Sequence, residues 1–248
     1  MPSSVRAVAF AALLLLPVTR AGAITADELV AKNVEAKGGR AAIEAVQSLR
    51  RSGKLIAGGG RFVLDVVETK RRPDSMRVDL SLQGLTQVQA YDGREGWQID
   101  PFGGRKDPER MAADDVKSLA EEASIGGPLV DAQARGSTVE YLGTEDIDGT
   151  AAHKLKVTQR NGDVKYVYLD PDYFLEIRVE SQRSVRGVRQ VTVTDLGNYE
   201  KVGGVYWALS HESAPKGSSD RTTIEYDRTE VNPEVAPAFF AFPAGTGQ

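Results

Sequence analysis

The stretch "STVEYLGTEDIDGTAAHKLKVTQRNGDVKYVYLDPDYFLEIRVESQ", residues 137–182, decides the fold class. It contains four runs typical of strands, separated by the turn pairs Asp148-Gly149, Asn161-Gly162 and Asp170-Pro171. Asn-Gly and Asp-Gly are strong hairpin signals because both residues tolerate the positive φ of a tight turn. Strands joined by such short turns indicate an antiparallel meander rather than a parallel sheet.

The same texture extends through most of the chain after residue 50. In "SMRVDLSL", residues 75–82, the apolar side chains Met76, Val78, Leu80 and Leu82 alternate with polar ones. This alternation is typical of a half-buried antiparallel strand. Together with "RQVTVTDLGNYEKVGGVYWALSHES" and "DRTTIEYDRTEV", the runs predict about eleven strands.

Helices are expected at two places. Residues 25–37 have the spacing of a capping box at Thr25 and Glu28, and Gly38-Gly39 ends the helix. A second short helical turn is expected in "RAAIEAVQSL", residues 40–49.

A third helix interrupts the strands. Asp107 is a favourable N-cap and Pro108 suits the first helical position. The segment "ERMAADDVKSLAEEASI", residues 109–125, then carries Met111, Val116, Leu119 and Ala123 at helical spacing. "LVDAQAR", residues 129–135, is expected to add another short helical piece. An amphipathic helix beside a large meander can act as a lid over a hydrophobic pocket suited to acyl chains.

The N-terminal segment and the composition indicate where the protein is located and which partners are unlikely. Twelve apolar residues, 7–18, follow Arg6 and precede the small residues 21–23. This run is too short to span a membrane, so residues 1–23 are expected to be a secretory signal cleaved near Ala23. Residues 24–248 then form a single domain. No later apolar run predicts stable membrane insertion, and the net charge of −4 with dispersed basic residues makes nucleic acid an unlikely partner.

Candidate catalytic groups gather in "QAYDGREGWQIDPFGGRKDPE", residues 89–109. Its carboxylates Asp92, Glu95, Asp100, Asp107 and Glu109 surround Trp97. Acid–base catalysis needs two carboxylates at a fixed separation with a shifted pKa. These acids instead occupy turn and cap positions, where Asp is favoured for its local hydrogen bonds. The stretch therefore predicts a hairpin rather than an active site.

Metal and cofactor sites are not expected. The chain has no cysteine and only two histidines, His153 and His211, whereas zinc sites usually need three or four protein ligands. The glycine-rich "IAGGGRF" lacks the spacing of a nucleotide motif. Lys70, Arg71, Arg72 and Arg77 cluster in one segment. They indicate either a solvated strand end or a clasp for an anionic group or a helix C-terminus.

Three stretches resemble the LolA-like superfamily of periplasmic lipoprotein carriers and outer-membrane lipoprotein-sorting proteins. "VVETKRRPDSMRV", residues 66–78, resembles its Lys-Arg-Pro signature, and "AYDGREGWQIDPF", residues 90–102, resembles its Asp-Gly hairpin. "FFAFPAG", residues 239–245, resembles its closing strand. Each motif is weak alone, and their order and spacing carry the resemblance. The C-terminal half is closer to the broader sorting-protein branch than to LolA itself.

The resemblance implies a mainly β fold with an α lid, an unclosed antiparallel β-barrel or half-barrel around a hydrophobic cavity. It also implies that Arg72 bonds to backbone carbonyls of the lid. We expect that lid helix to end near Ile125. The second arginine at Arg71, the longer second half and "GGVYWALSH", residues 203–211, depart from LolA. These departures leave the cargo open among lipoprotein, free lipid or glycolipid, and another apolar molecule.

The leading hypothesis is therefore a periplasmic, non-enzymatic carrier of lipid or lipoprotein acyl chains. Its partners would be an inner-membrane donor and an outer-membrane acceptor. The expected cavity and lid residues are Arg72, Met76, Val78, Leu80, Trp97, Met111 and Leu119. Two alternatives remain: an envelope sensor or interaction module with the same fold, and an enzyme or accessory factor in envelope lipid biosynthesis.

Overall fold

The computed structural model describes residues 24–185 and 187–243. The expected signal segment, residues 1–23, lies outside the described residues. Within them, thirteen strands form one antiparallel sheet rather than the expected eleven or so. The strands are β1 (Ser48–Ala57), β2 (Phe62–Arg71), β3 (Ser75–Leu82), β4 (Leu85–Tyr91), β5 (Gly96–Asp100), β6 (Arg105–Arg110), β7 (Thr138–Ile147), β8 (Thr150–Thr158), β9 (Val164–Leu169), β10 (Glu176–Val185), β11 (Val188–Val202), β12 (Val205–Pro215) and β13 (Thr222–Val231).

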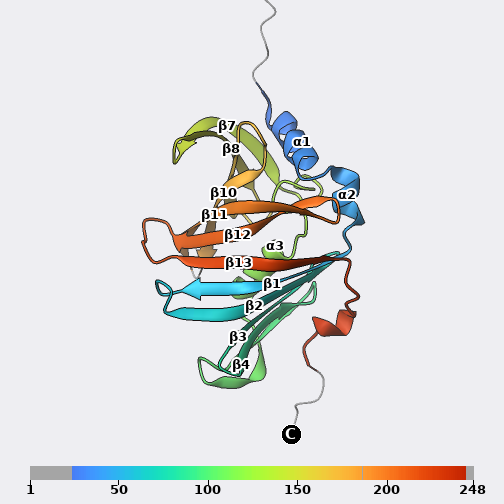
Figure 1. Ribbon diagram of the computed structural model, residues 1–248, viewed down its shortest axis with the longest axis vertical. Coiled ribbons are helices and arrows are strands. Elements are labelled where there is room, and N and C mark those ends of the chain that lie inside the picture. Colours follow the sequence, from blue (N-terminus) through green and yellow to red (C-terminus); the bar gives the residue numbers. More distant parts are fainter. Residues whose placement is uncertain (1–23, 186, 244–248) are drawn as a thin grey trace, which may run out of the picture.

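The sheet is built from two meanders joined at one seam. Its order is β6-β5-β4-β3-β2-β1-β13-β12-β11-β10-β9-β8-β7, so almost every neighbour is also a neighbour in sequence. The seam pairs β1 with β13, from Leu49 opposite Val231 to Ile56 opposite Thr223. The outermost strands β6 and β7 do not pair, and the predicted unclosed antiparallel barrel is confirmed. Figure 1 shows the strong twist along this sheet.

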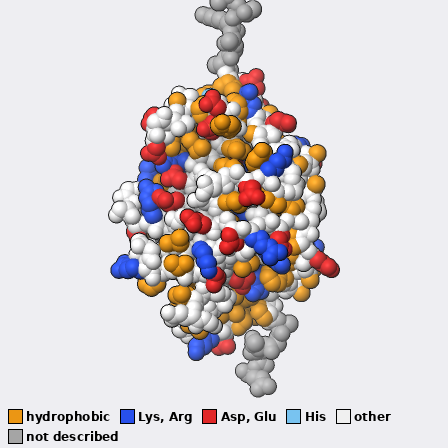
Figure 2. All heavy atoms as spheres, in the orientation of Figure 1, with side chains coloured by type: hydrophobic (Ala, Val, Ile, Leu, Met, Phe, Trp, Pro, Cys, Tyr) orange, Lys and Arg blue, Asp and Glu red, His pale blue; other side chains and the backbone are white. Residues whose placement is uncertain are grey.

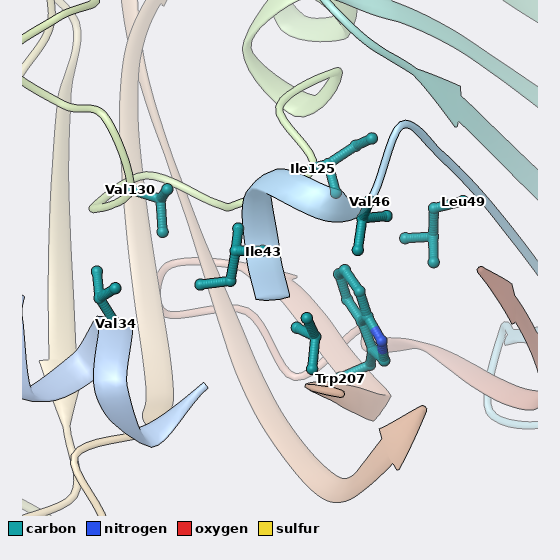
Figure 3. Close-up of a cluster of buried hydrophobic side chains, with 8 residues drawn as sticks. Val34, Ile43, Val46, Leu49, Ile125, Val130 and Trp207 are labelled. Carbon is teal, nitrogen blue, oxygen red and sulfur yellow. The ribbon is translucent and has the colours of Figure 1, made fainter. Parts of the chain in front are cut away.

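Two short helices pack at one end of the strands, α1 (Ala26–Ala36) and α2 (Arg40–Ala45). The predicted capping box is present, because the Thr25 hydroxyl accepts from the Glu28 N–H and the Glu28 carboxylate accepts from the Thr25 N–H. Figure 3 shows Ile43 of α2 between Val34 of α1 and Trp207 of β12, in one buried cluster. This cluster anchors both helices to the sheet through burial of apolar surface.

The third helix begins later than expected. Asp107 and Pro108 lie in strand β6, and α3 (Ala113–Glu122) starts five residues beyond Pro108. β6 pairs only with β5 at the sheet edge, where proline and charged side chains are tolerated because one side of the ladder needs no donor. Residues 129–135, expected to be helical, form turns.

The carboxylates of residues 89–109 serve local structure, as predicted for a hairpin. Asp92 Oδ1 accepts from the backbone N–H groups of Arg94 and Glu95 at 2.8 and 2.9 Å. Asp100 Oδ1 accepts from the Gly103 N–H at 3.0 Å. Both are turn contacts that fix the chain reversals on either side of β5.

Trp97 of β5 is buried beneath the C-terminal segment. Its side chain is 2% exposed, and its indole Nε1 donates to the Phe240 carbonyl at 2.8 Å. The Phe242 ring meets it edge-on at 6.2 Å between centroids. The expected closing strand at 239–245 is a short 3-10 helix, η1 (Pro237–Phe239), followed by irregular chain through Pro243, and residues 244–245 lie outside the described part.

Arg72 contacts a helix end, but not that of α3. Its Nε donates to the Val46 carbonyl at 2.8 Å and its Nη2 to the Ile43 carbonyl at 3.0 Å, both at the C-terminal end of α2. The expected contact near Ile125 was wrong, because the turn between β2 and β3 lies beside α2. The physical reason for the contact is the one anticipated: free carbonyls at a helix end attract a cation.

We expect Trp97→Ala to lower the free energy of unfolding by about 3–5 kcal/mol, the usual cost of deleting a buried aromatic side chain. Trp97→Phe keeps most of the packing but leaves the buried Phe240 carbonyl unpaired, so its cost should be about 1–3 kcal/mol. Urea unfolding measures both, and limited proteolysis should release the C-terminal segment sooner in each variant. A loss below about 1 kcal/mol for Trp97→Ala would contradict the burial described here.

Arg72→Leu should destabilise the docking of α2, because two carbonyls lose bonds from a charged donor that are worth about 1.5–3 kcal/mol each. Hydrogen exchange of α2 amides should accelerate, while amides of α3 should not change. Arg71→Leu is the matched control, because it removes the neighbouring charge at the last residue of β2 and leaves both Arg72 bonds in place. Equal acceleration in the two variants would show that Arg72 has no special contact with α2.

Candidate functional site

Helix α3 lies on one face of the sheet and spans its two meanders. Met76 and Val78 of β3 and Tyr91 of β4 pack under Met111, Leu119 and Ala123. On its other side, Glu121 forms ion pairs with Lys165 of β9 at 3.3 Å and with Arg183 of β10 at 3.6 Å. α3 is therefore held by apolar contacts at one meander and by charges at the other.

Beyond α3, the same face of the sheet stays apolar but is not fully covered. Strand register places seven side chains together there, and we call them the open apolar face: Leu55, Phe62, Leu64, Leu80, Leu82, Leu85 and Ile224. All are half-buried or exposed, with Phe62 54% and Leu85 43% exposed. They cluster toward the end of the sheet where the β1–β2, β3–β4 and β12–β13 hairpins turn (Figure 1).

The opposite face at the same level is mostly polar, although Ile56 and Val63, the latter 47% exposed, also lie on it. Its polar side chains are Lys54, Asp65, Ser81, Thr86 and Glu225, which are register partners across the same five strands. Lys54 pairs with Asp65, and the Ser81 and Thr86 hydroxyls bond at 2.8 Å. The view in Figure 2 shows acidic and basic side chains interspersed over the molecular surface. The face that carries these polar side chains is therefore the one suited to contact with water. The open apolar face is left available to cover an apolar ligand.

Next to the open apolar face, on the same side of the sheet, lies a buried charged cluster. Arg51 of β1 donates from Nε and Nη2 to Glu68 Oε1 at 3.0 and 2.7 Å. Its Nη1 donates to the Ala208 carbonyl at 3.2 Å, and its guanidinium lies 3.9 Å from the centre of the Tyr226 ring. Lys70 Nζ is 3.6 Å from Glu68 Oε2. Two cationic side chains therefore share one carboxylate.

The surroundings set the protonation of this cluster. Burial opposes ionisation of Glu68, but Arg51 and Lys70 outweigh it and lower the pKa of Glu68 to about 2. Burial, reinforced by Arg51, lowers the pKa of His211 to about 3, so this histidine is neutral near pH 7. Burial also lowers the pKa of Lys70, against the attraction of Glu68. The charge on Lys70 is thus only partly compensated by its neighbours.

A pocket of about 150 Å³ opens onto the cluster. Arg51, Lys70 and His211 line it from the sheet, and Ser124, Ile125, Gly127 and Pro128 line it from the segment that follows α3. Lys37 and Glu176 also line it. These two are paired at 2.9 Å, and Lys37 donates as well to the Gly126 carbonyl at 3.1 Å. The pocket wall includes both cations of the cluster but not Glu68.

The structure brings together some of the site residues expected from the sequence and separates others. One apolar cluster contains Leu119 of α3, the preceding Met111, and Met76 and Val78 of β3. Leu80 belongs to the open apolar face. Trp97 lies on the opposite face of the sheet, because Ala90 is its register partner and Ala90 pairs with Arg77 rather than Met76. Arg72 lies at the end of α2. These two residues are therefore parts of the scaffold.

Sequence reasoning missed the charged cluster. The available signal was the period of β2, where Glu68 and Lys70 occupy the positions that Leu64 and Val66 occupy earlier in the strand. Charged residues at the inward positions of a half-buried strand indicate a polar site inside the fold.

Residues 24–185 and 187–243 contain no group of three or more histidine, cysteine or acidic side chains placed to hold a metal ion. Across the same ranges, no helix has the length and apolar character needed to cross a bilayer.

Comparison with known proteins gives matches in structure but not in sequence. No protein-family model matches the chain, and no curated protein matches it significantly. A LolA superfamily protein from Nitrosomonas europaea aligns with a TM-score of 0.60 at 14% identity, over 88% of this chain and 98% of the other. A DUF1329 family protein from Desulfovibrio piger aligns with a TM-score of 0.61 at 11% identity, over 87% and 97%.

A third crystal structure, of an outer membrane lipoprotein-sorting protein domain from Vibrio parahaemolyticus, aligns with a TM-score of 0.57 at 12% identity, over 87% of this chain and 97% of that domain. At these identities the alignments establish the architecture. The chain has the LolA-like fold, an unclosed antiparallel β-barrel with a helical lid.

Proposed function

We propose that this protein is a periplasmic carrier that shields the acyl chains of a lipid or lipoprotein during transfer toward the outer membrane. The observation that carries the proposal is the open apolar face, seven side chains across five strands that remain half-buried or exposed. The lipoprotein-sorting domain with the same architecture supports it.

Physical magnitudes favour an acyl chain as the molecule that covers this face. Each CH₂ group removed from water contributes about 0.8 kcal/mol, so a long chain gains several kcal/mol from contact with one apolar wall. A linear chain also fits a surface that extends across five strands rather than into a single deep hollow. The polar opposite face keeps the protein hydrated while the chain is bound.

Helix α3 serves as the lid in this proposal. Leu119 of this helix and Ala123 just after it pack on Met76 of β3. Glu121 forms ion pairs with Lys165 and Arg183. The Glu121–Lys165 pair is nearly buried, with side chains 8% and 10% exposed, so opening would re-expose both charges to water. Hydration of the freed charges compensates part of the cost of moving the helix aside.

The direct test is organic extraction and mass spectrometry of protein purified from cells that produce it naturally. A carrier should release about one lipid or lipid-modified peptide per protein, since one face with one lid offers one site. Extraction of no lipid, together with a protein partner that survives salt washes, would favour a sensor instead. Turnover of an added lipid would favour an enzyme.

A pair of substitutions tests the face itself. Leu80→Asp places a charge on the open apolar face, and Ser81→Asp places the same charge one residue along β3 on the opposite face. A phospholipid with a fluorescent acyl chain should bind Leu80→Asp about tenfold more weakly or worse, because apolar contact is lost and a carboxylate must be desolvated. Ser81→Asp should bind within about twofold of the unmodified protein.

Both positions are partly exposed, so thermal unfolding should show two folded variants. Equal affinity in the two variants would place the acyl chain elsewhere and remove the open apolar face from the proposed function.

A further inference from the structure

We infer that the pocket over Arg51 and Lys70 binds the anionic headgroup of a singly acylated amphiphile whose chain lies on the open apolar face. The inference rests on the proposed carrier function and specifies the chemical class of its ligand. The shared chemistry is a carboxylate or a phosphate monoester joined to one hydrocarbon chain.

The charge of the pocket wall favours an anion beside Lys70. Lys37 and Glu176 compensate each other at 2.9 Å, whereas Arg51 and Lys70 share the carboxylate of Glu68. Glu122 of α3 also attracts Lys70, but it is paired with Arg183 at 3.2 Å. Arg51 holds Glu68 through two short bonds, while Lys70 Nζ stands at 3.6 Å from it, too far for a good hydrogen bond. The cation with the weaker partner is the one that can accept a new anion.

The less compensated cation is also buried. Lys70 is 9% exposed and Arg51 6% exposed. A buried ammonium without a full counter-charge is costly, and the lowered pKa of Lys70 has that cause. An anion in the pocket would supply the missing charge in surroundings where water screens it little.

The pocket and the open apolar face lie on the same side of the sheet. His211 of β12 lines the pocket and is the register partner of Ile224, which belongs to the open apolar face. On β2, the side chains facing this side run from Lys70 and Glu68 to Leu64 and Phe62. Val66 lies between Glu68 and Leu64 on this face and is 1% exposed, so a chain with its headgroup in the pocket reaches the open apolar face once the side chains that cover Val66 move aside.

The volume of the pocket limits the size of the headgroup. The pocket measures about 150 Å³, which suits a small headgroup and not a lipid with a large polar or peptide head. Tyr199 is fixed beside it by a bond from its hydroxyl to the Glu176 carbonyl at 2.7 Å, and the segment 124–128 closes the side away from the sheet. The headgroup is thus selected by charge and by volume.

The test compares the fluorescent polyene fatty acid cis-parinaric acid with its methyl ester at about pH 8, where an ordinary carboxyl group is ionised. Chain and fluorophore are identical, so only the charge differs. We expect the acid to bind the unmodified protein about tenfold more tightly or better, the usual effect of a charged hydrogen bond. Ester binding as tight as acid binding would overturn the inference and leave the carrier function standing.

Lys70→Met removes the charge while keeping a similar apolar stem, and it should abolish the preference for the acid without weakening the ester. Lys54→Met, on the opposite face of neighbouring β1, is the matched control and should keep the preference. A Lys70→Met variant that still prefers the acid would overturn the assignment. If Lys70→Met does not fold, the comparison of acid and ester on the unmodified protein still decides the inference.

Competition distinguishes the two sources of the anion. Palmitate and palmitoyl lysophosphatidate are each titrated against bound parinarate, and displacement by either supports the inference and identifies carboxylate or phosphate as the preferred group. Displacement by neither overturns it. Failure of both parinarate and its ester to bind would count against the carrier function as well as the headgroup site.

Discussion

The pairing of β1 with β13 is the contact on which the rest of the structure depends. It joins the meander β1–β6 to the meander β7–β13, and without it the chain would hold two separate sheets. The seam includes a bulge at Ser52 and Gly53, where any Cβ on Gly53 would come within 1.9 Å of the Glu225 carbonyl oxygen. Only glycine permits this approach, which bends the seam. Arg51 lies two residues before Gly53 on the same face of β1, and its Nη1 donates across β13 to the Ala208 carbonyl of β12.

The apolar clusters stabilise the fold, whereas the charged cluster is not explained by stability. Apolar clusters such as the one around Ile43 and Trp207 stabilise the packing of the helices on the sheet by ordinary burial (Figure 3). A buried ion pair is weak evidence for stability, because desolvation offsets most of the attraction. Arg51, Glu68 and Lys70 therefore occupy positions where apolar residues would have served the fold as well. A polar group kept at such a position points to a role in binding, and the pocket beside it supplies the place.

The sequence predicted what depends on local chemistry. Asp-Gly and Asn-Gly turns located the hairpins, and Thr25 with Glu28 located the start of α1. It failed at β6, because Asp107-Pro108 has the pattern of a helix start and an edge strand need not alternate. It also could not assign Trp97 to a face, since a shift of one residue exchanges the faces of a strand. The charged cluster was only partly accessible: Arg51 and Glu68 face each other across the β1–β2 hairpin, but His211 joins them only through the pairing of β1 with the distant strand β13.

The geometry of β2 gives the proposed ligand a direction. Lys70 and Leu64 lie on the same face of this strand, and six residues at about 3.3 Å each separate them by about 20 Å. One leaflet of a bilayer offers its acyl chains about half of the roughly 30 Å hydrocarbon thickness, so a single chain can extend along this strand. With its headgroup at Lys70, the chain would point toward Phe62 and Leu85, the most exposed members of the open apolar face. The tail, and not the charged head, would then be the first part to meet an apolar acceptor. The buried anion would be exposed to water last, after the chain has left the sheet.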